Sequence, residues 1–577
     1  MADDDKPMTP EARPKTDRVV IDAKKRNKNA GLGRCSDRRS SSHSTSEVNA
    51  IMEGAAMTMP AQVSVDAKGE QLAVLLYLRS AAAFAPAGIA HEIDTHAASI
   101  FLVGDRAWKL KRAVRFGYLD FTTAAKREEA LKAELKLNRR TTVGLYLAIH
   151  PITRDVAGQL AIDGTGETID WLLEMRRFPD DALLADMADR GKISFDIAVR
   201  LADRIVAFHA LAASVTDGGA KARFLTVVEE NAASLAVFAD ILPMAAATGL
   251  CEAHRAAALK MGTLLDSRGS AGRVRHVHGD LHLANIAMID GEPTMFDCLE
   301  FSETLATTDV LYDLAFLLMD LWHRGLRSEA NMVFNRYLDR SPVDEDGVAL
   351  IALFVSVRAT IRAHVMAAQA ARADAAPNLA LAARAYLDLA ITTMMPGEAS
   401  VLAIGGFSGT GKSSVARALA GAIGRVPGAR IVRSDVLRKQ LAGVMPETRL
   451  NVGQYTQESS QRVYAAVNRA TAAMLAAGQS VVVDAVFAQV GERAACARTA
   501  KSGKSRFKGL WLVATDSQRY SRVSERCADA SDADTEVALA QANIDPGLLG
   551  DWIPLSADAP LDDVSAAAVA ILRREED

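Results

Sequence analysis

The pattern of apolar positions divides the chain into a polar beginning and a long structured remainder. Met1–Gly54 is rich in Asp, Lys, Arg and Ser, includes the run SDRRSSSHSTS at Ser36–Ser46, and shows almost no apolar periodicity. A segment with so few apolar residues cannot bury enough surface to offset its conformational entropy. The pattern therefore predicts a disordered tail over residues 1–65.

From about residue 70 the apolar positions alternate or recur with helical spacing. Two alternating runs separated by Gly104-Asp-Arg106 indicate a β-hairpin, and a later pair of runs indicates two further strands. From there to about residue 370 the pattern is mostly helical. These features predict an α+β domain over 66–378, with a helix at Gln71–Arg79, strands at Ser99–Val103 and Ala107–Lys111, a helix at Lys126–Arg140, and strands at Leu145–Ile152 and Thr168–Phe178.

The last third of the chain has a different pattern. A helix at Pro377–Met395 predicts a linker over 379–398. The strand Val401–Ile404 then opens a regular alternation of strands and helices that continues to the end. Such alternation is typical of an α/β domain with a parallel sheet, and we expect one over 399–577.

Composition narrows the classes of function. Of the 577 residues, 49% are apolar and 24% are charged, and the formal net charge of −4 does not favour nucleic acid as a partner. The longest apolar runs, Val310–Trp322 and Ala349–Val357, fall short of the roughly 18 residues of a membrane-spanning helix. Five scattered cysteines without a C-x-x-C pair argue against a disulfide scaffold or a structural zinc site. We therefore expect a cytoplasmic, multi-domain protein that binds neither nucleic acid nor membranes.

The strongest motif in the chain follows the strand Val401–Ile404 and precedes a predicted helix at Ser414–Ile423. It fits the pattern G-x-x-x-x-G-K-[ST] at every position. Glycines let backbone N–H groups point at phosphate oxygens, the lysine neutralises the β and γ phosphates, and the serine hydroxyl can hold Mg²⁺. The motif predicts an ATP site made by Gly406, Phe407, Ser408, Gly409, Thr410, Gly411, Lys412, Ser413 and Ser414.

Charged residues near this loop indicate what else the domain binds. Two predicted strands end in carboxylates, Asp435 and Asp484, at the sheet edge where the phosphate loop lies. Carboxylates there suit substrate orientation, base work and Mg²⁺ water-shell binding. Arg519, Arg522 and Arg526 are spaced three and four apart on a predicted helix, from which they could close over the phosphates as a lid.

Four segments of the C-terminal domain carry a family resemblance: GFSGTGKSS, VRSDVLRKQLAGV (Val432–Val444), VVVDAVF (Val481–Phe487) and RCADASDAD (Arg526–Asp534). With them the domain resembles the small P-loop kinases of the gluconate and shikimate kinase type. It is most similar to the ATP-binding half of the two-domain bifunctional aminoglycoside phosphotransferase/ATP-binding proteins. This resemblance implies that Asp435 and Arg438 face the substrate, while Arg522 and Arg526 form a lid over ATP.

A second motif lies in the middle of the chain. His278, Asp280 and Asn285 occur within the run HGDLHLAN, and Asp297 follows twelve residues after Asn285, behind a predicted hairpin. In kinases such an Asp accepts the proton of the substrate hydroxyl, while the Asn and a later Asp hold Mg²⁺. The glycine after His278, together with His282 inside the loop, resembles the aminoglycoside and choline kinase branch. We therefore predict Asp280 as the catalytic base and Asn285 and Asp297 as magnesium ligands.

Upstream residues agree with a kinase-like first lobe. The run A-W-K resembles the A-x-K of the third kinase strand, which makes Lys109 the expected phosphate-binding lysine. Lys111 lies on the same strand face and stays an alternative. Glu134 is the expected helix partner of the lysine, with Glu128 and Glu129 as alternatives.

One departure from the kinase pattern concerns the turn that would cover the phosphates. The corresponding segment, Asp94–Ser99, contains no glycine. Backbone N–H groups are therefore harder to bring close to phosphate oxygens at this site than at the C-terminal motif.

A further feature of this domain is a pair of arginines. Arg358 and Arg362 are four residues apart on a predicted helix, so they share one face. The motifs assign this basic face no purpose.

Together these motifs predict ATP-dependent phosphoryl transfer to a small hydroxylated molecule, with ATP and Mg²⁺ as cofactors. The fold would be an aminoglycoside-phosphotransferase-like kinase domain followed by a P-loop kinase domain. One alternative is an ATP-binding regulatory or stress protein whose first domain is a catalytically silent sensor, and another is a plain P-loop NTPase. The residues that carry the main prediction are Lys109, Glu134, Asp280, Asn285 and Asp297 in the first site, and Lys412, Ser413, Asp435 and Asp484 in the second.

Overall fold

The computed structural model describes residues 65–573, apart from 96, 117–118, 373–376 and 526–529. The tail predicted over 1–65 lies almost wholly outside the described residues, as do Cys35, Arg526 and Cys527. Cys251, Cys298 and Cys496 are buried free thiols.

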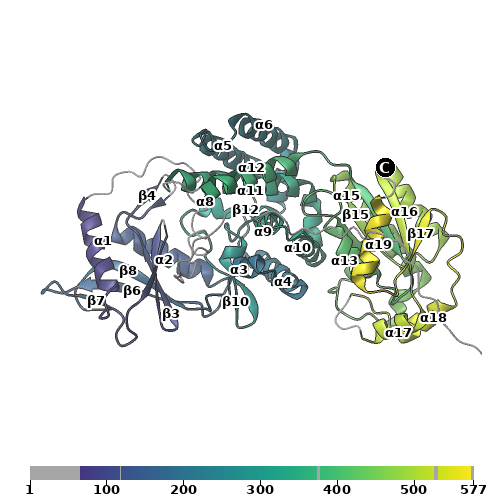
Figure 1. The fold of residues 1–577 in the computed structure, drawn as a ribbon, viewed down its shortest axis with the longest axis horizontal. Helices are drawn as coiled ribbons and strands as arrows, with labels where there is room; N and C mark the ends of the chain where they lie inside the picture. Colours follow the sequence, from purple (N-terminus) through teal and green to yellow (C-terminus); the bar gives the residue numbers. More distant parts are fainter. Residues whose placement is uncertain (1–64, 96, 117–118, 373–376, 526–529, 574–577) are drawn as a thin grey trace, which may run out of the picture. The chain divides into compact units, whose positions relative to one another are not determined.

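An antiparallel sheet organises the first part of the described chain (Figure 1). Its strands follow the order β1-β2-β3-β8-β6-β7, and the predicted hairpin and the second predicted strand pair are both part of it. A small separate ribbon pairs β4 with β5. The elements are α1 (Val65–Leu78), β1 (His91–Asp94), β2 (Ala98–Val103), β3 (Arg106–Lys111), β4 (Arg115–Phe116), β5 (Leu119–Asp120), α2 (Ala124–Asn138), β6 (Tyr146–Arg154), β7 (Leu160–Ile162) and β8 (Glu167–Arg176).

The two faces of this sheet are buried by different helices. On one face, Phe101 and Leu110 pack with Val74 and Leu78 of α1. On the other, Leu173 and neighbouring side chains pack with Leu131 of α2. Side chains alternate along a strand, so Lys109 and Lys111 lie on the face opposite Leu110, toward α2. The strand period thus directs both lysines to the helix that carries Glu134.

The following region is helical, with short ribbons that carry the central motif. The motif lies between β9 and β10, and Asp297 follows directly after the β10–β11 hairpin, which turns at Asp290-Gly291 with both residues at positive φ. The elements are α3 (Leu184–Asp189), α4 (Phe195–Leu211), α5 (Ala220–Ala236), α6 (Met244–Lys260), α7 (Gly262–Ser270), β9 (Val274–His276), η2 (Leu283–Asn285), β10 (Ile286–Ile289), β11 (Glu292–Met295), α8 (Glu303–Ala306), β12 (Thr307–Asp309), α9 (Val310–His323), α10 (Arg327–Arg340), η3 (Pro342–Leu350), α11 (Ile351–Arg372) and α12 (Pro377–Met394).

Helix α11 is a core helix of this region. It packs against α5, α9 and α12, and α12 in turn buries Ala383, Tyr386, Leu387 and Ala390. In the described part of the chain, one helical stretch, Pro342–Ala371, is long and apolar enough to cross a membrane, and 83% of its most apolar window is buried inside the protein. The expectation that no segment reaches this length therefore holds only for uninterrupted apolar runs, because Arg358 and Arg362 interrupt this one.

The C-terminal part forms the predicted parallel sheet. Its strands follow the order β14-β15-β13-β16-β17 and all pair in parallel, so the phosphate-loop motif emerges from the central strand β13. Apolar side chains of β13, α13 and α19 pack together on one face. The elements are β13 (Ser400–Gly405), α13 (Lys412–Ala420), β14 (Arg430–Arg433), α14 (Ser434–Leu441), η4 (Val452–Tyr455), α15 (Gln457–Ala476), β15 (Val481–Asp484), α16 (Val490–Ser502), β16 (Arg506–Val513), α17 (Asp516–Ser524), α18 (Thr535–Ala542), β17 (Trp552–Ser556) and α19 (Leu561–Arg573).

One strand prediction needs correction here. The second strand of the P-loop sheet ends at Arg433, so Asp435 is not a strand-end residue but lies in the first turn of α14. An acidic residue is favourable there because the N-terminal end of a helix carries a partial positive charge.

Candidate functional site

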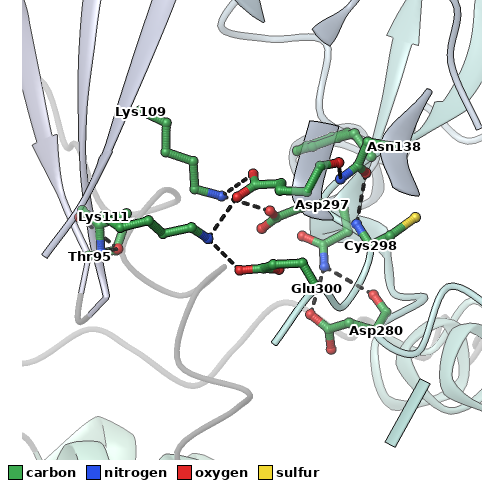
Figure 2. A network of polar contacts seen from close by, with 12 residues as sticks. Thr95, Lys109, Lys111, Asn138, Asp280, Asp297, Cys298 and Glu300 are labelled. Carbon is green, nitrogen blue, oxygen red and sulfur yellow. Dashed lines mark hydrogen bonds and ion pairs between the residues drawn. The ribbon is translucent and has the colours of Figure 1, made fainter. Parts of the chain in front are cut away.

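A buried lysine with two carboxylate partners forms the centre of the first site (Figure 2). Lys109 Nζ lies 2.7 Å from Glu134 Oε1 and 2.8 Å from Asp297 Oδ1. Of the three glutamates considered on α2, the structure brings Glu134 to the lysine, whereas Glu128 pairs with Lys132 on the outer face. The strand, the helix and the segment after the hairpin therefore meet at one ammonium group.

The alternative lysine belongs to the same network. Lys111 Nζ lies 2.7 Å from the second oxygen of Glu134 and also forms an ion pair with Glu300. Figure 2 shows Lys109 and Lys111 extending from one strand toward Asp297 and Glu300. Burial by itself would lower the pKa of each lysine, but the surrounding carboxylates raise it, so both stay charged. The sequence did not indicate Glu300, whose partner is 189 residues away.

Asp297 is held in place by its own backbone. Its φ of 61° lies in the left-handed region, and its N–H donates to Tyr146 Oη at 3.0 Å. The N–H of Cys298 donates to Asn138 Oδ1 at 2.8 Å, which ties this segment to the end of α2. Burial would raise the pKa of Asp297, but the Lys109 ammonium lowers it below its usual value. The carboxylate is therefore ionised and positioned.

The predicted base, Asp280, lies in a loop in which most polar groups are hydrogen-bonded. Asn285 Nδ2 donates to Asp280 Oδ2 at 2.7 Å and to the Asp280 carbonyl at 3.0 Å. His278 Nε2 donates to the Phe296 carbonyl at 2.9 Å, which fixes the loop to the residue between β11 and Asp297. Among the described residues, the buried Oδ1 atoms of Asp280 and Asn285 have no hydrogen-bond partner. One carboxylate oxygen of Asp280 is thus available to a ligand.

A third aspartate, Asp313 of α9, anchors this loop. Its carboxylate accepts from the N–H groups of His278 at 3.3 Å and Gly279 at 2.8 Å, and from His209 Nε2 at 3.0 Å. Gly279 has a φ of +83°, and a Cβ there would lie 2.9 Å from the side chain of Leu299. Sequence reasoning missed this role of Asp313; the available signal was a carboxylate within a largely apolar helix, since such a buried charge needs partners.

The glycine-free turn closes on itself. Ser99 Oγ donates to Asp94 Oδ1 at 2.5 Å, and the N–H of Thr95 donates to the Ala98 carbonyl at 2.8 Å. Arg112 Nη1 donates to the Thr95 carbonyl at 2.7 Å. Side-chain bonds therefore shape the described part of a turn that glycines shape in protein kinases.

The residues present fit Mg²⁺ and ATP at this first site. Hard cations prefer oxygen ligands, and the ionised Asp297 and the unpartnered Asn285 Oδ1 are oxygens of the expected kind. Lys109 is the cation predicted to contact phosphate oxygens.

The C-terminal motif forms a loop that requires its glycines. Gly406, Gly409 and Gly411 have φ of +136°, +85° and +89°. A Cβ on Gly406 would lie 2.6 Å from the Leu512 carbonyl oxygen, and one on Gly409 would lie 2.4 Å from that of Arg519. The loop leads into α13, whose N-terminal N–H groups favour anions, and Lys412 Nζ lies 3.0 Å from the Phe407 carbonyl.

The two predicted metal ligands of this site are in direct contact. Ser413 Oγ donates to Asp484 Oδ2 at 2.6 Å. Arg433 donates to both, with Nη2 at 3.1 Å from Ser413 Oγ and Nε at 3.2 Å from Asp484 Oδ2. A hydroxyl and a carboxylate beside a phosphate loop are the groups that hold Mg²⁺ in P-loop proteins, so the donor set fits the ion.

The predicted substrate residues line a large cleft of about 1490 Å³ next to the loop. Burial raises the pKa of Asp435, while Arg433 opposes the shift. Arg438 Nη1 donates to the Gln454 carbonyl at 2.9 Å, and its guanidinium lies 4.7 Å from the Tyr455 ring centre. Asp435, Arg438 and the phosphate loop therefore share one cleft.

The three predicted lid arginines have different places. Arg519 is buried under the phosphate loop, where it donates to the carbonyls of Ser408 and Ala538, each at 3.0 Å; as a lid residue it is therefore a wrong prediction. Arg522 lines the cleft, with Nη1 3.8 Å from the Cβ position of Gly411. Arg526 lies outside the described residues.

Known proteins similar to this chain cover both of its parts. A family model described as an AAA domain matches residues 401–543. The uncharacterized proteins Rv2004c of Mycobacterium tuberculosis and Mb2027c of Mycobacterium bovis are each 30% identical over 461 residues, which is 78% of this chain and 89% of the relative. The chain belongs to their family. The matched length exceeds either predicted domain, 66–378 or 399–577, so the relationship includes parts of both.

Solved structures are similar to each part separately. A gluconokinase from Sinorhizobium meliloti is 22% identical and covers 31% of this chain and 93% of its own, with a TM-score of 0.24. An ethanolamine kinase from Plasmodium vivax is 12% identical and covers 53% of this chain and 80% of its own, with a TM-score of 0.32. A glucosamine kinase is 17% identical and covers 59% and 84%, with a TM-score of 0.33.

Proposed function

We propose that the protein is an ATP-dependent phosphotransferase that acts on a small hydroxylated molecule at Asp280. The observation that carries the proposal is the Asp280 carboxylate, which has one oxygen fixed by Asn285 and the other without a partner, in the same site as Lys109, Glu134 and Asp297. A base and two oxygen ligands beside a buried ammonium group are the parts that phosphoryl transfer requires.

Each side chain has a defined role in this proposal. When bound, MgATP supplies the terminal phosphoryl group and leaves as MgADP. Asp280 Oδ1 accepts the proton of the alcohol as the alcohol oxygen forms its new bond to phosphorus and the bond from that phosphorus to the leaving diphosphate breaks. Asn285 and Asp297 hold the metal ion, and Lys109, oriented by Glu134, contacts phosphate oxygens.

The second site is proposed as a separate nucleotide site. Lys412 and the loop 406–414 hold the phosphates, with Arg522 above them, and Ser413 and Asp484 hold Mg²⁺. Asp435 acts on a substrate that Arg438 helps to bind. Support comes from the shared cleft and from the bond between Ser413 and Asp484.

One observation favours a second candidate function, in which the first site only senses ATP. The described part of the Asp94–Ser99 turn is closed by side-chain bonds and has no glycine to expose N–H groups to phosphate. In that case the protein binds ATP at the first site without transferring phosphate. The proposed chemistry and this candidate differ in what Asp280 does.

The experiment measures phosphate transfer from ATP to a panel of small alcohols by full-length protein and by Asp280→Asn. This substitution keeps the size and hydrogen bonding but removes the base, and should lower transfer by about 10²–10⁴-fold while ATP still binds. Asp290→Asn is the matched control, because Asp290 is an exposed turn residue with a φ of 53° that asparagine tolerates. Unchanged transfer by Asp280→Asn would reject the proposal.

A further inference from the structure

A cavity of about 170 Å³ adjoins Asp280 within the helical region. Its lining includes Asp280, Gly279 and residues of α5, α9 and α11, but not Lys109, Asn285 or Asp297. Asp280 is therefore shared between this cavity and the site of the predicted phosphate and metal ligands. At one water per roughly 10–15 Å³ of such volume, the cavity has room for a molecule of about a dozen non-hydrogen atoms.

The walls of this cavity are aromatic and hold one arginine in a fixed position. Phe224, Tyr312 and Phe354 contact one another edge-on, with ring centres 5.1–5.6 Å apart. The Arg358 guanidinium lies 3.9 Å from the Tyr312 ring centre and 4.7 Å from that of Phe316. Its Nε donates to the Tyr312 carbonyl at 3.2 Å. Stacking and this bond together pre-organise the guanidinium.

Three residues of the lining carry buried polar donor atoms that lack a partner. Among the described residues, Arg358 Nη2, Asn231 Nδ2 and Tyr312 Oη have no hydrogen bond, although their residues are only 6%, 5% and 3% exposed. The side-chain oxygen Oδ1 of Asn231 accepts from His364 Nε2 at 3.2 Å, which leaves the side-chain nitrogen Nδ2 as the group without a partner. Burial raises the pKa of Tyr312, so its hydroxyl stays a donor. Unpaired buried donors are costly and therefore indicate a missing acceptor.

The charges around the cavity give the sign of that missing partner. Asp309 is held by Arg268, and Arg223 pairs with Asp217. In the part of the chain that the structure describes, Arg358 has no carboxylate within ion-pair distance. Burial raises the pKa of Glu230, another residue of the lining, which weakens its tendency to carry a negative charge. Arg358 acts electrostatically on the buried carboxylates of Asp280 and Asp313 but forms an ion pair with neither, so its Nη2 still offers a charged donor to an anionic group of a ligand.

We propose that this cavity is the subsite for the phosphate-accepting alcohol and that it selects a small alcohol bearing a carboxylate or phosphate group. The Arg358 guanidinium binds the anionic group, and Asn231 Nδ2 and Tyr312 Oη donate to the same ligand. The alcohol hydroxyl then lies at Asp280 Oδ1. The proposal rests on the proposed function for the role of Asp280, and it assigns a purpose to Arg358, one of the two arginines on the basic face of α11.

The test uses matched probes and full-length protein. Glycerate and gluconate represent carboxylates, glycerol 3-phosphate represents phosphates, glycerol and glucose are neutral, and ethanolamine and glucosamine are cationic. Binding is measured by titration calorimetry and transfer by product formation from MgATP. We expect at least one anionic probe to bind more tightly than its neutral counterpart, and the two anionic arms identify whether carboxylate or phosphate is preferred.

The variants separate charge from packing. Arg358→Gln should weaken binding of the anionic probe by about 10- to 100-fold, and Arg358→Lys by less, because the charge remains without the planar fork. Asn231→Asp places a negative charge in the subsite while Arg358 stays unchanged, and it should also weaken binding of the anionic probe. Arg362→Gln is the control: this arginine lies one turn away over the Tyr386 ring, outside the lining, and should leave binding unchanged.

The outcomes distinguish this inference from the proposed function. Binding that depends on Arg358, together with transfer that is insensitive to Asp280→Asn, would keep the subsite and reject the function. Transfer to neutral or cationic alcohols that depends on Asp280 but not on Arg358 would keep the function and overturn the subsite. If none of the anionic probes binds, the subsite is likewise rejected.

Discussion

The two candidate nucleotide sites hold charge in opposite ways. The C-terminal site is shaped by backbone conformation, because Gly406, Gly409 and Gly411 all adopt positive φ. At Gly406 and Gly409 a Cβ would overlap neighbouring backbone atoms. The first site is instead shaped by ion pairs between side chains: Lys109 and Lys111 pair with Glu134, Asp297 and Glu300. The glycine-free turn there is closed by its own side-chain bonds.

This difference determines how each site should fail. A backbone cradle depends on local conformation, so a single methyl group in the loop should damage it. A side-chain network depends on charge balance between segments far apart in sequence, so removing one charge should destabilise the fold around it. The following substitutions test each expectation, beginning with the largest effect.

Glu134→Gln should produce the largest loss of stability. It removes the charge that both buried lysines share, and breaking a buried ion pair costs about 3–5 kcal/mol. Calorimetric unfolding of the full chain measures the effect. Glu128→Gln, on the same helix but paired with a largely exposed Lys132, should cost at most about 0.5 kcal/mol. Equal effects of the two variants would mean that the network does not stabilise the first site.

Gly409→Ala should disturb the backbone cradle of the second site. The new Cβ would lie within 2.8 Å of three backbone atoms of Arg519, at a φ of +85°. Strain and overlap together should cost about 2–4 kcal/mol and remove ATP binding at this site. Gly443→Ala has a similar φ of +71° but open space around it, so it should show only the strain, about 1–2 kcal/mol, and keep ATP binding.

Lys412→Ala should leave the fold of the C-terminal domain intact but weaken its binding of MgATP. The loop keeps its N–H donors and loses its fixed positive charge, so MgATP affinity at this site should fall by about 100-fold in titration calorimetry. Lys501→Ala, at an exposed position of α16 outside the cleft, is the control. Unchanged affinity in Lys412→Ala would show that the loop 406–413 is not the phosphate site.

Acid titration should show the most gradual effect, because it is spread over several pH units. Burial lowers the pKa of His364 to about 3 and that of His254 to about 4, from 6.5. As the pH falls below 6.5, these histidines become protonated in the unfolded chain but stay neutral in the folded protein. The free energy of unfolding therefore declines by up to about 1.4 kcal/mol per pH unit for each histidine. The lowered pKa values of Asp280, Asp297 and Asp313 act only below the unfolded value of 3.8. His364→Gln should therefore reduce the slope of the unfolding free energy against pH between pH 6 and 4. A slope equal to that of the unchanged protein would contradict the lowered pKa of His364.

The sequence predicted local features better than long-range ones. The P-loop, the hairpin with Lys109 and the spacing of Asp280 and Asn285 are each contained in a short segment, and the described structure has them where expected. The contact of Glu134 with Lys109 followed from a kinase resemblance. Glu300 and Asp313 were missed because nothing near them in sequence indicates their partners.

The remaining errors concern helix positions. Asp435 was expected at the end of a strand, but the strand ends two residues earlier and a helix begins. Arg519 was expected to lie over the phosphates with Arg522, yet it faces inward because its position on α17 points under the loop, where Ser408 and Ala538 carbonyls need donors. Spacing along a helix gives the relative directions of such side chains, but not which of them is buried.

The most direct test of the central claim, that Asp280 transfers phosphate independently of the P-loop, is product formation in a Lys412→Ala background. The account predicts that Lys412→Ala still phosphorylates its alcohol substrate, and that adding Asp280→Asn lowers the rate by about 10²–10⁴-fold. If Lys412→Ala alone removes all transfer, and Asp280→Asn in the otherwise unchanged protein has no effect, then the first site is a sensor and the claim is contradicted.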